Sequence, residues 1–180
     1  MTETLVPNRD CGSCAVCCTH LSITSPELTK PAGVVCVHCT TGSGCGIYDT
    51  RPSVCRTWHC GWRTLPLEDS WRPDRCGILI SLTQERIPSH FEKRVGVKFQ
   101  FVDSLQSAQW EPFVIYIASL IEKKIPVFLC VPGPAGHDST VTFLNDGMAA
   151  AVASRNYERI AQEILHALDM RGRRKTAAPV

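Results

Sequence analysis

The chain has 180 residues, of which 44% are hydrophobic and 20% charged, so we expect a packed domain with room for a small additional module rather than wholesale disorder. Its 19 basic and 17 acidic residues give a formal net charge of +2, which is too balanced to indicate nucleic acid or an anionic membrane as the partner. The longest uncharged apolar run, residues 113–121, is too short to span a bilayer.

Cysteine is the unusual component of this sequence. The chain has 11 cysteines, and all except Cys130 lie within the first 76 residues. Residues 1–10 carry charges and a proline where a secretory signal peptide would have an apolar stretch, so we expect a cytoplasmic protein. Because the cytoplasm keeps thiols reduced, the concentration of cysteine favours metal ligands over a disulfide framework.

The segment up to about residue 63 contains Cys-x-x-Cys spacings, glycines and prolines, and we expect turns and short helices folded around a site. Cysteines three residues apart, such as Cys11 and Cys14, can point to the same side of a turn, and Gly12 relieves the tight backbone that this requires. The side chains of the neighbours Cys17 and Cys18 should diverge. This pair indicates either two metal positions or one ligand and one spare thiol.

Three arrangements of ligands compete. A zinc ribbon leaves five cysteines of the region without a role; its ligands would be Cys14, Cys17, Cys36 and Cys39. A bacterial ferredoxin run is broken, because Leu21 and Ser22 stand where its fourth cysteine and the following proline belong. An iron–sulfur cluster would therefore take a ligand from afar, for example Cys36, Cys45 or Cys55. The third arrangement is a cluster that combines cysteines of residues 11–18 with those from Cys36 onward, and it uses the most thiols.

Charge argues against a nucleic-acid-binding finger. Residues 1–60 contain as many acidic as basic residues, and thiolates bound to a metal would make the region negative. Arg51 and Arg56 are candidates for donors to the thiolate shell, with an ordinary surface position as the alternative. His38 and His59 each adjoin a cysteine, but abundant thiols make histidine ligands less necessary.

The pattern changes after Cys76 to that of a small sheet. Branched and aromatic residues predict strands at residues 77–82 and 95–102. Apolar runs predict two further strands, at residues 125–131 and 140–144.

Two helices are expected in this part of the chain. Pro112 stands where a first helical turn would start, and apolar residues then recur at helical spacing for about three turns. The last helix follows an apolar stripe from Tyr157 to Leu168, with Ser154 placed to cap it.

For some cysteines and tryptophans the sequence favours, or allows, a packing role instead of metal binding. Cys130 lies in an apolar run and is expected to be a packed core thiol, whereas Cys76 could be either a ligand or a core residue. Trp58, Trp62 and Trp71 are expected to cover the metal loops as hydrophobic lids, because such modules have little core of their own.

Two stretches together resemble the signature of a known family. They are Cys-x2-Cys-x2-Cys-Cys at residues 11–18 and Cys-Gly-Ile-Tyr-Asp-Thr-Arg-Pro-Ser-Val-Cys-Arg at residues 45–56. They resemble the cysteine-cluster proteins described as chelators of zinc or iron, the CxxCxxCC or YkgJ-like family, a branch of which is similar to flagellin lysine N-methylases with an iron–sulfur cluster.

The resemblance covers roughly residues 11–60, a third of the chain, and does not extend to residues 77–180. This sequence departs from the family pattern in having both Cys36 and Cys39 and in adding Cys60 and Cys76. The ligand set that the resemblance implies is Cys11, Cys14, Cys17, Cys18, Cys36, Cys45 and Cys55, followed by Cys39 and Cys60.

The sequence therefore predicts an α+β protein. A cysteine-cluster metal-binding module of turns and short helices, residues 1–76, precedes a small mixed sheet with helices, residues 77–180, and we expect the two parts to pack as one unit. The predicted function is chelation of zinc or iron by cysteine thiolates, an iron–sulfur cluster included, in a structural or sensory role. The alternative is an iron–sulfur-dependent redox or group-transfer enzyme. Metal ions are the expected partners, with neither nucleic acid nor a membrane. The predicted metal ligands are Cys11, Cys14, Cys17, Cys18, Cys36, Cys39, Cys45, Cys55 and Cys60.

Overall fold

The cysteine-rich segment forms only short elements joined by turns. The computed structural model describes residues 4–40, 42–92, 95–102 and 104–176, with side chains up to residue 169. Two antiparallel ribbons, β1–β2 and β3–β4, accompany short helices in this segment. The elements are α1 (Val16–His20), β1 (Ile23–Thr24), β2 (Thr29–Lys30), β3 (Cys39–Thr40), β4 (Gly44–Cys45), the 3-10 helix η1 (Tyr48–Thr50), α2 (Ser53–Thr57) and α3 (Gly61–Thr64).

A mixed four-stranded sheet follows. Its strand order is β5-β6-β7-β8, with β6 and β7 parallel and the two outer pairs antiparallel. The parallel pair needs a crossover connection, which a helix supplies. The elements are the 3-10 helix η2 (Asp69–Trp71), α4 (Pro73–Cys76), β5 (Ile78–Thr83), β6 (Gly96–Phe101), the 3-10 helix η3 (Leu105–Gln109), α5 (Glu111–Glu122), β7 (Val127–Val131), β8 (Thr140–Phe143), α6 (Asn145–Ala153) and α7 (Tyr157–Thr176).

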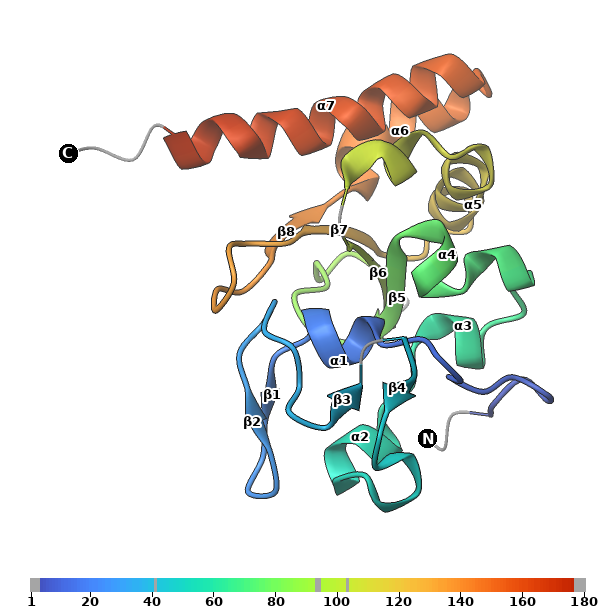
Figure 1. Cartoon of the computed structure of the whole chain (residues 1–180). Coiled ribbons are helices and arrows are strands. Elements are labelled where there is room, and N and C mark those ends of the chain that lie inside the picture. The colour runs from blue at the N-terminus through green and yellow to red at the C-terminus, as the bar shows by residue number, and fades with distance from the viewer. Residues whose placement is uncertain (1–3, 41, 93–94, 103, 177–180) are drawn as a thin grey trace.

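The two faces of the sheet have different partners, because alternate residues of a strand point to opposite sides. Ile80 and Phe99 face the main core, which they share with residues of α5, α6 and α7. Leu79, between the inward residues of β5, joins a second apolar cluster with Val16 of α1 and Val102. Figure 1 shows the helices α5–α7 on one side of the sheet and the cysteine-rich elements on the other.

The structure confirms the α+β class, and the four expected strands are present within two residues of their predicted bounds. The helix expected from Pro112 is α5, which begins at Glu111. α6 was not anticipated: its alanine-rich sequence has weak amphipathic character, although Met148 and Val152 are buried. No helix in the described part of the chain is long and apolar enough to cross a membrane.

The expected cap of the last helix was wrong by two residues. Ser154 lies at the end of α6, where its hydroxyl donates to the Ala151 carbonyl over 2.6 Å. The side chain of Asn156 instead accepts a hydrogen bond from the Arg159 amide over 3.0 Å, immediately before α7. Asparagine and serine are both good caps, so the sequence could not rank them without knowing where α6 ends.

Candidate metal centre

The two Cys-x-x-Cys segments form the same kind of tight turn. The Cys14 amide donates to the Cys11 carbonyl over 2.9 Å, and the Cys39 amide donates to the Cys36 carbonyl over 2.9 Å. Gly12 has φ +50°, a left-handed conformation that glycine adopts at little cost, as the sequence predicts. Each turn therefore presents its pair of thiols from one short loop.

Eight of the nine predicted ligands surround one cavity of about 310 Å³. They come from loops, short helices and a ribbon that are well separated in sequence. The ninth, Cys39, is absent from the lining, although its thiol makes a hydrogen bond to that of Cys18. The cysteines around the cavity are Cys11, Cys14, Cys17, Cys18, Cys36, Cys45, Cys55 and Cys60.

Glycine allows the separated cysteine segments to approach one another. Gly44 precedes Cys45, has φ +83°, and a Cβ atom at this position would lie 2.5 Å from the Gly12 carbonyl oxygen. Any other residue at this position would clash with the backbone of the Cys11–Cys14 turn. The β3–β4 ribbon and the first cysteine turn are therefore in direct backbone contact.

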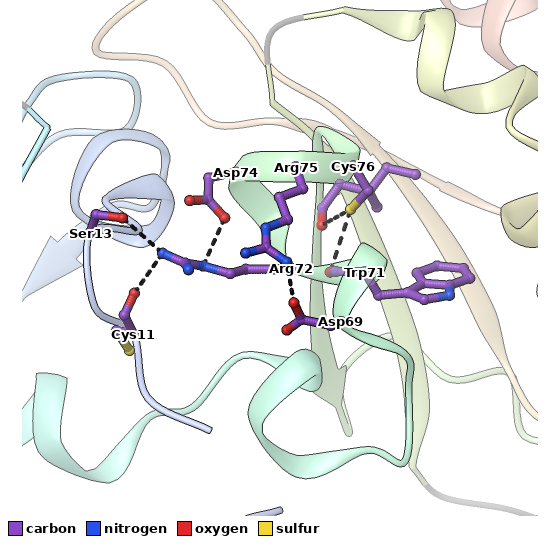
Figure 2. Close-up of polar contacts among 9 residues, drawn as sticks. Cys11, Ser13, Asp69, Trp71, Arg72, Asp74, Arg75 and Cys76 are labelled. Atoms are coloured by element: carbon purple, nitrogen blue, oxygen red, sulfur yellow. Dashed lines mark hydrogen bonds and ion pairs between the residues drawn. The ribbon is translucent and has the colours of Figure 1, made fainter. Parts of the chain in front are cut away.

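Arg72 attaches the first cysteine turn to the sheet side of the molecule. Its Nη2 atom lies 3.0 Å from the Cys11 carbonyl oxygen and 3.1 Å from Ser13 Oγ, while its Nε atom lies 3.0 Å from an Asp74 carboxylate oxygen. Figure 2 shows this guanidinium reaching from the start of α4 to the loop that carries Cys11. These contacts hold the loop through a backbone carbonyl and a serine hydroxyl and do not involve the thiol groups.

Lys30 also holds backbone near the cavity cysteines. It is 4% exposed, and its ammonium group donates to the carbonyls of Thr19, Pro31 and Val34 over 3.0, 3.1 and 2.6 Å. The three bonds link the end of α1, which carries Cys18, to the loop that leads to Cys36. Burial lowers the pKa of Lys30, and the nearby thiol groups oppose that shift.

Two arginines place positive charge at the cavity wall. Arg63 is 8% exposed, and its Nη1 atom lies 3.6 Å from Cys11 Sγ and 3.1 Å from the Tyr48 hydroxyl oxygen. The Arg51 guanidinium lies 3.6 Å from the centre of the Tyr48 ring, a cation–π contact, and also lines the cavity. Arg56 is exposed and does not line the cavity, so of the predicted pair only Arg51 lies near the thiols.

Backbone amides face several of the sulfur atoms. Burial raises the pKa of the Cys14, Cys45 and Cys60 thiols, and hydrogen bonds from nearby amides act in the opposite direction. These amides belong to Val16 and Asp74 for Cys14, to Ile47 for Cys45, and to residues 62 and 63 for Cys60. Such donors stabilise a thiolate wherever a cation or metal replaces the proton.

Cys18 differs from its neighbours. Its pKa is lowered to about 6, first by a hydrogen bond from the Cys17 thiol, then by one from Cys39 and by the charges of Lys30 and Arg51. The pKa of Cys17 is raised correspondingly, because its proton is held between the two sulfur atoms and its side chain is buried. Within this pair the ionised form is favoured at Cys18 over Cys17.

Two other cysteines lie in the packed core, whereas the two histidines considered as ligands lie at the cavity. Cys130 is 1% exposed on β7, in agreement with a core thiol. Cys76 packs at the edge of the main core, and its thiol lies 3.4 Å from the carbonyls of Trp71 and Ile78. Both resemble packed residues rather than cluster members. His38 and His59 both line the cavity.

The expectation that three tryptophans cover the metal loops was wrong for two of them. Trp62 and Trp71 are each 5% exposed in the main core, where Trp71 packs 4.7 Å from Trp110, centre to centre. Trp58 does line the thiol cavity. The other two are held by the sheet and α5, which sequence proximity to the cysteines does not reveal.

Three residues important to the site were missed from the sequence: Lys30, Arg63 and Arg72. The one available signal was Arg63, which follows Cys60 at helical spacing and so lies on the same face of α3. Nothing in the sequence pattern marks Lys30, because its partners are backbone carbonyls, or Arg72, because it reaches a carbonyl and a hydroxyl about sixty residues away.

All eleven cysteines are free thiols. Within the described ranges, no three His, Cys, Asp or Glu side chains converge closely enough to hold a metal ion as they stand. Searches against family models, curated proteins and solved structures find no match for this chain.

Proposed function

We propose that the protein binds zinc or iron through the thiols of this cavity, as a single ion, several ions or an iron–sulfur cluster, in a structural or sensory role in the cytoplasm. The observation that carries the proposal is the gathering of eight cysteines from distant segments around one cavity of about 310 Å³. Thiolate is the ligand type that zinc and iron–sulfur clusters take from proteins.

The surroundings of the thiols fit this use. A cluster of thiolates accumulates negative charge, and Lys30, Arg51 and Arg63 lie beside the cavity to offset it. Donors that act on the sulfur atoms are the usual companions of metal-bound thiolates. Buried cations next to buried thiols would otherwise be costly, because neutral thiols give them no counter-charge.

The proposal is tested with cysteine variants of the full chain purified without oxygen. Cys14→Ser and Cys55→Ser remove cavity thiols and should lower the metal content per chain, whereas Cys130→Ser removes a core thiol and should leave it unchanged. Equal metal content in all three variants and the wild type would contradict the proposal. Visible absorption near ~400 nm with acid-labile sulfide identifies an iron–sulfur centre, and a colourless protein containing zinc identifies the other form.

An enzyme is the second candidate, and one observation favours it. A second cavity of about 320 Å³ lies against the same face of the sheet, and Lys98 and Gln100 of β6 line both cavities. The Lys98 side chain makes no hydrogen bond or ion pair with the other residues that the structure describes, although its backbone is part of the sheet. A polar pocket adjoining a thiol cavity could hold the substrate of a redox or group-transfer reaction.

Reduction distinguishes this candidate from a purely structural centre. A redox-active iron–sulfur centre should lose visible absorption on anaerobic addition of dithionite and recover it on mild reoxidation. A protein that carries only zinc, or whose spectrum is indifferent to dithionite, would contradict the enzyme candidate and leave the metal-binding proposal intact.

A further inference from the structure

The second cavity, of about 320 Å³, lies beside the thiol cavity on the face of the sheet that carries the cysteine-rich segment. Its floor includes two pairs of neighbouring residues in register, Lys98 with Phe128 and Gln100 with Cys130, on the parallel strands β6 and β7. Phe99 packs in the main core, so the residues before and after it on β6 point to the opposite face. Two polar side chains therefore stand near the middle of the sheet and face this cavity.

Three loops form the walls of the second cavity. They are the segment after α1, the β5–β6 connection and the β7–β8 loop, which reaches from the sheet to the cysteine-rich segment in Figure 1. The Gly136 amide of the β7–β8 loop donates to the Ala32 carbonyl over 2.7 Å. Next to this bond, a Cβ atom on Gly33 would lie 3.2 Å from the Ala135 Cα atom. Backbone contacts of the fold itself thus close the cavity on this side.

Two cations of this cavity have no counter-charge. The side chains of Lys98 and Arg86 make no hydrogen bond or ion pair with the other residues in the described part of the chain. Lys98 is partly buried on the floor, whereas Arg86 is exposed in the β5–β6 connection. Because a partly buried charge without a partner is costly, the arrangement favours an anion between these two side chains.

The carboxylates of the same cavity are placed less deeply. Glu85 and Asp138 are both exposed, and neither lies within ion-pair distance of the two cations. Burial raises the pKa of the Cys130 thiol on the floor, and the charges of Lys98 and Arg86 act in the opposite direction. Both cations therefore influence the floor from the same side, and no carboxylate is among the groups that act on this thiol.

We propose that the second cavity binds a small organic anion whose carboxylate or phosphate group lies between Lys98 and Arg86. Gln100 and the Ser139 hydroxyl are available to hydrogen bond to the rest of the molecule, and Phe128 offers an apolar surface. Small-molecule sites commonly have volumes of about 300–1,000 Å³, so this cavity fits a ligand at the small end of that range. The site goes beyond metal binding and does not require it, but it places the ligand next to the thiol cavity, because Lys98 and Gln100 line both.

Isothermal titration calorimetry of the full chain purified without oxygen tests the site with three probes. Inorganic phosphate and succinate carry the two kinds of anionic group, and putrescine carries the opposite charge. Saturable binding of phosphate or succinate at millimolar concentration, weakened by added salt, supports the proposal, and the preferred probe identifies the anionic group. Binding of putrescine alone, or of none of the three, would overturn the proposal.

Two variants remove the cations with little disturbance of the fold. Arg86 has φ +57°, a left-handed conformation that glycine adopts more readily, so Arg86→Gly deletes the guanidinium at a position that suits glycine. Arg155→Gly is the matched control, since Arg155 is also exposed and has φ +52°. Arg86→Gly and Lys98→Gln should each weaken anion binding about tenfold or more, as expected for loss of a charged hydrogen bond. Anion affinities of both variants equal to that of the control would contradict the site.

A third variant changes the affinity in the opposite direction, which misfolding cannot do. Asp138→Asn removes a carboxylate from the cavity lining and should strengthen anion binding by about twofold to fivefold. An unchanged or weaker affinity would count against an anion in this cavity.

Metal content measured on the same samples separates this site from the proposed metal centre. Lys98→Gln should keep the wild-type metal content while it loses anion affinity. A variant that loses metal but binds anions as the wild type does would show that Lys98 serves the thiol cavity, and would overturn its assignment here. Anion binding by a wild-type protein that contains no metal would uphold this inference and refute the proposed metal binding.

Discussion

At the scale of single residues, the site depends on long side chains that hold backbone rather than on the thiols themselves. Lys30, 4% exposed, links carbonyls at the end of α1 and in the loop that leads to Cys36, and Arg72 links the first turn to the start of α4. Because these groups fix the loops before any metal is present, the thiols are partly positioned by the fold.

Lys30→Met should weaken the fold of the cysteine-rich segment. The variant keeps the length of the aliphatic stem but leaves three carbonyls without the ammonium donor, and loss of a charged hydrogen bond costs about 1.5–3 kcal/mol. Urea unfolding of the purified protein measures the loss. Lys123→Met, at an exposed position at the end of α5, is the control and should change stability by less than about 0.5 kcal/mol. Equal stability of the two variants would contradict the role given to Lys30.

The thiol of Cys76 should be unreactive at neutral pH. Burial raises the pKa of Cys76 to about 11, so its thiolate fraction at pH 8 is about one in a thousand, compared with about one in four for an ordinary cysteine. Its alkylation by iodoacetamide should therefore be more than about a hundredfold slower in the folded than in the unfolded chain, and should rise about tenfold per pH unit up to about 11. Mass spectrometry of labelled peptides gives both rates. Equal rates at pH 8 would show that Cys76 is exposed.

At the scale of elements, the strands and the longer helices follow from sequence periodicity, whereas the site follows only in part. Alternation and helical spacing are local signals, so β5, β6, β7, β8 and α5 could be placed in advance. The Cys-x-x-Cys turns and Gly12 are local too. Which thiols face one another depends on contacts such as that of Gly44 with the Gly12 carbonyl, and these join segments about thirty residues apart.

Gly44→Ala should separate the β3–β4 ribbon from the first cysteine turn. The Cβ atom of the alanine would lie 2.5 Å from the Gly12 carbonyl oxygen, which is a clash. Alanine also adopts the left-handed conformation of this position only at a cost of about 1–2 kcal/mol. Gly42→Ala is a matched control, since φ is +75° there and nothing lies within 4 Å of the added Cβ. The free energy of unfolding should fall by about 1 kcal/mol for the control and by clearly more for Gly44→Ala. Metal content should fall only in the latter. Identical losses would mean that the close approach has no structural importance.

At the scale of the whole molecule, the main core and the thiol cavity draw on different parts of the chain. Every buried residue of the main core lies at Trp62 or beyond, and the cavity thiols all precede it. The sheet joins the two, with its inner face in the main core and Leu79 on its other face beside α1. The cysteine-rich segment therefore has little apolar burial of its own, which is typical of segments that rely on metal.

Removal of metal should loosen one part of the molecule and spare the other. After treatment with a chelator, amides of residues 11–60 should lose protection from hydrogen exchange, because metal binding contributes directly to their folding. Amides of β5, β6 and β7 should keep their protection. Uniform loss of amide protection throughout the chain, or unchanged protection in residues 11–60, would contradict this account.

The central claim is that the cavity thiols are metal ligands. Metal analysis of the wild-type chain purified without oxygen, combined with a count of thiols protected from alkylation, tests it most directly. The account predicts at least one zinc or iron per chain and protection of the eight cavity cysteines until a chelator is added. Substoichiometric metal, with the same cysteines reactive or oxidised in pairs, would contradict it.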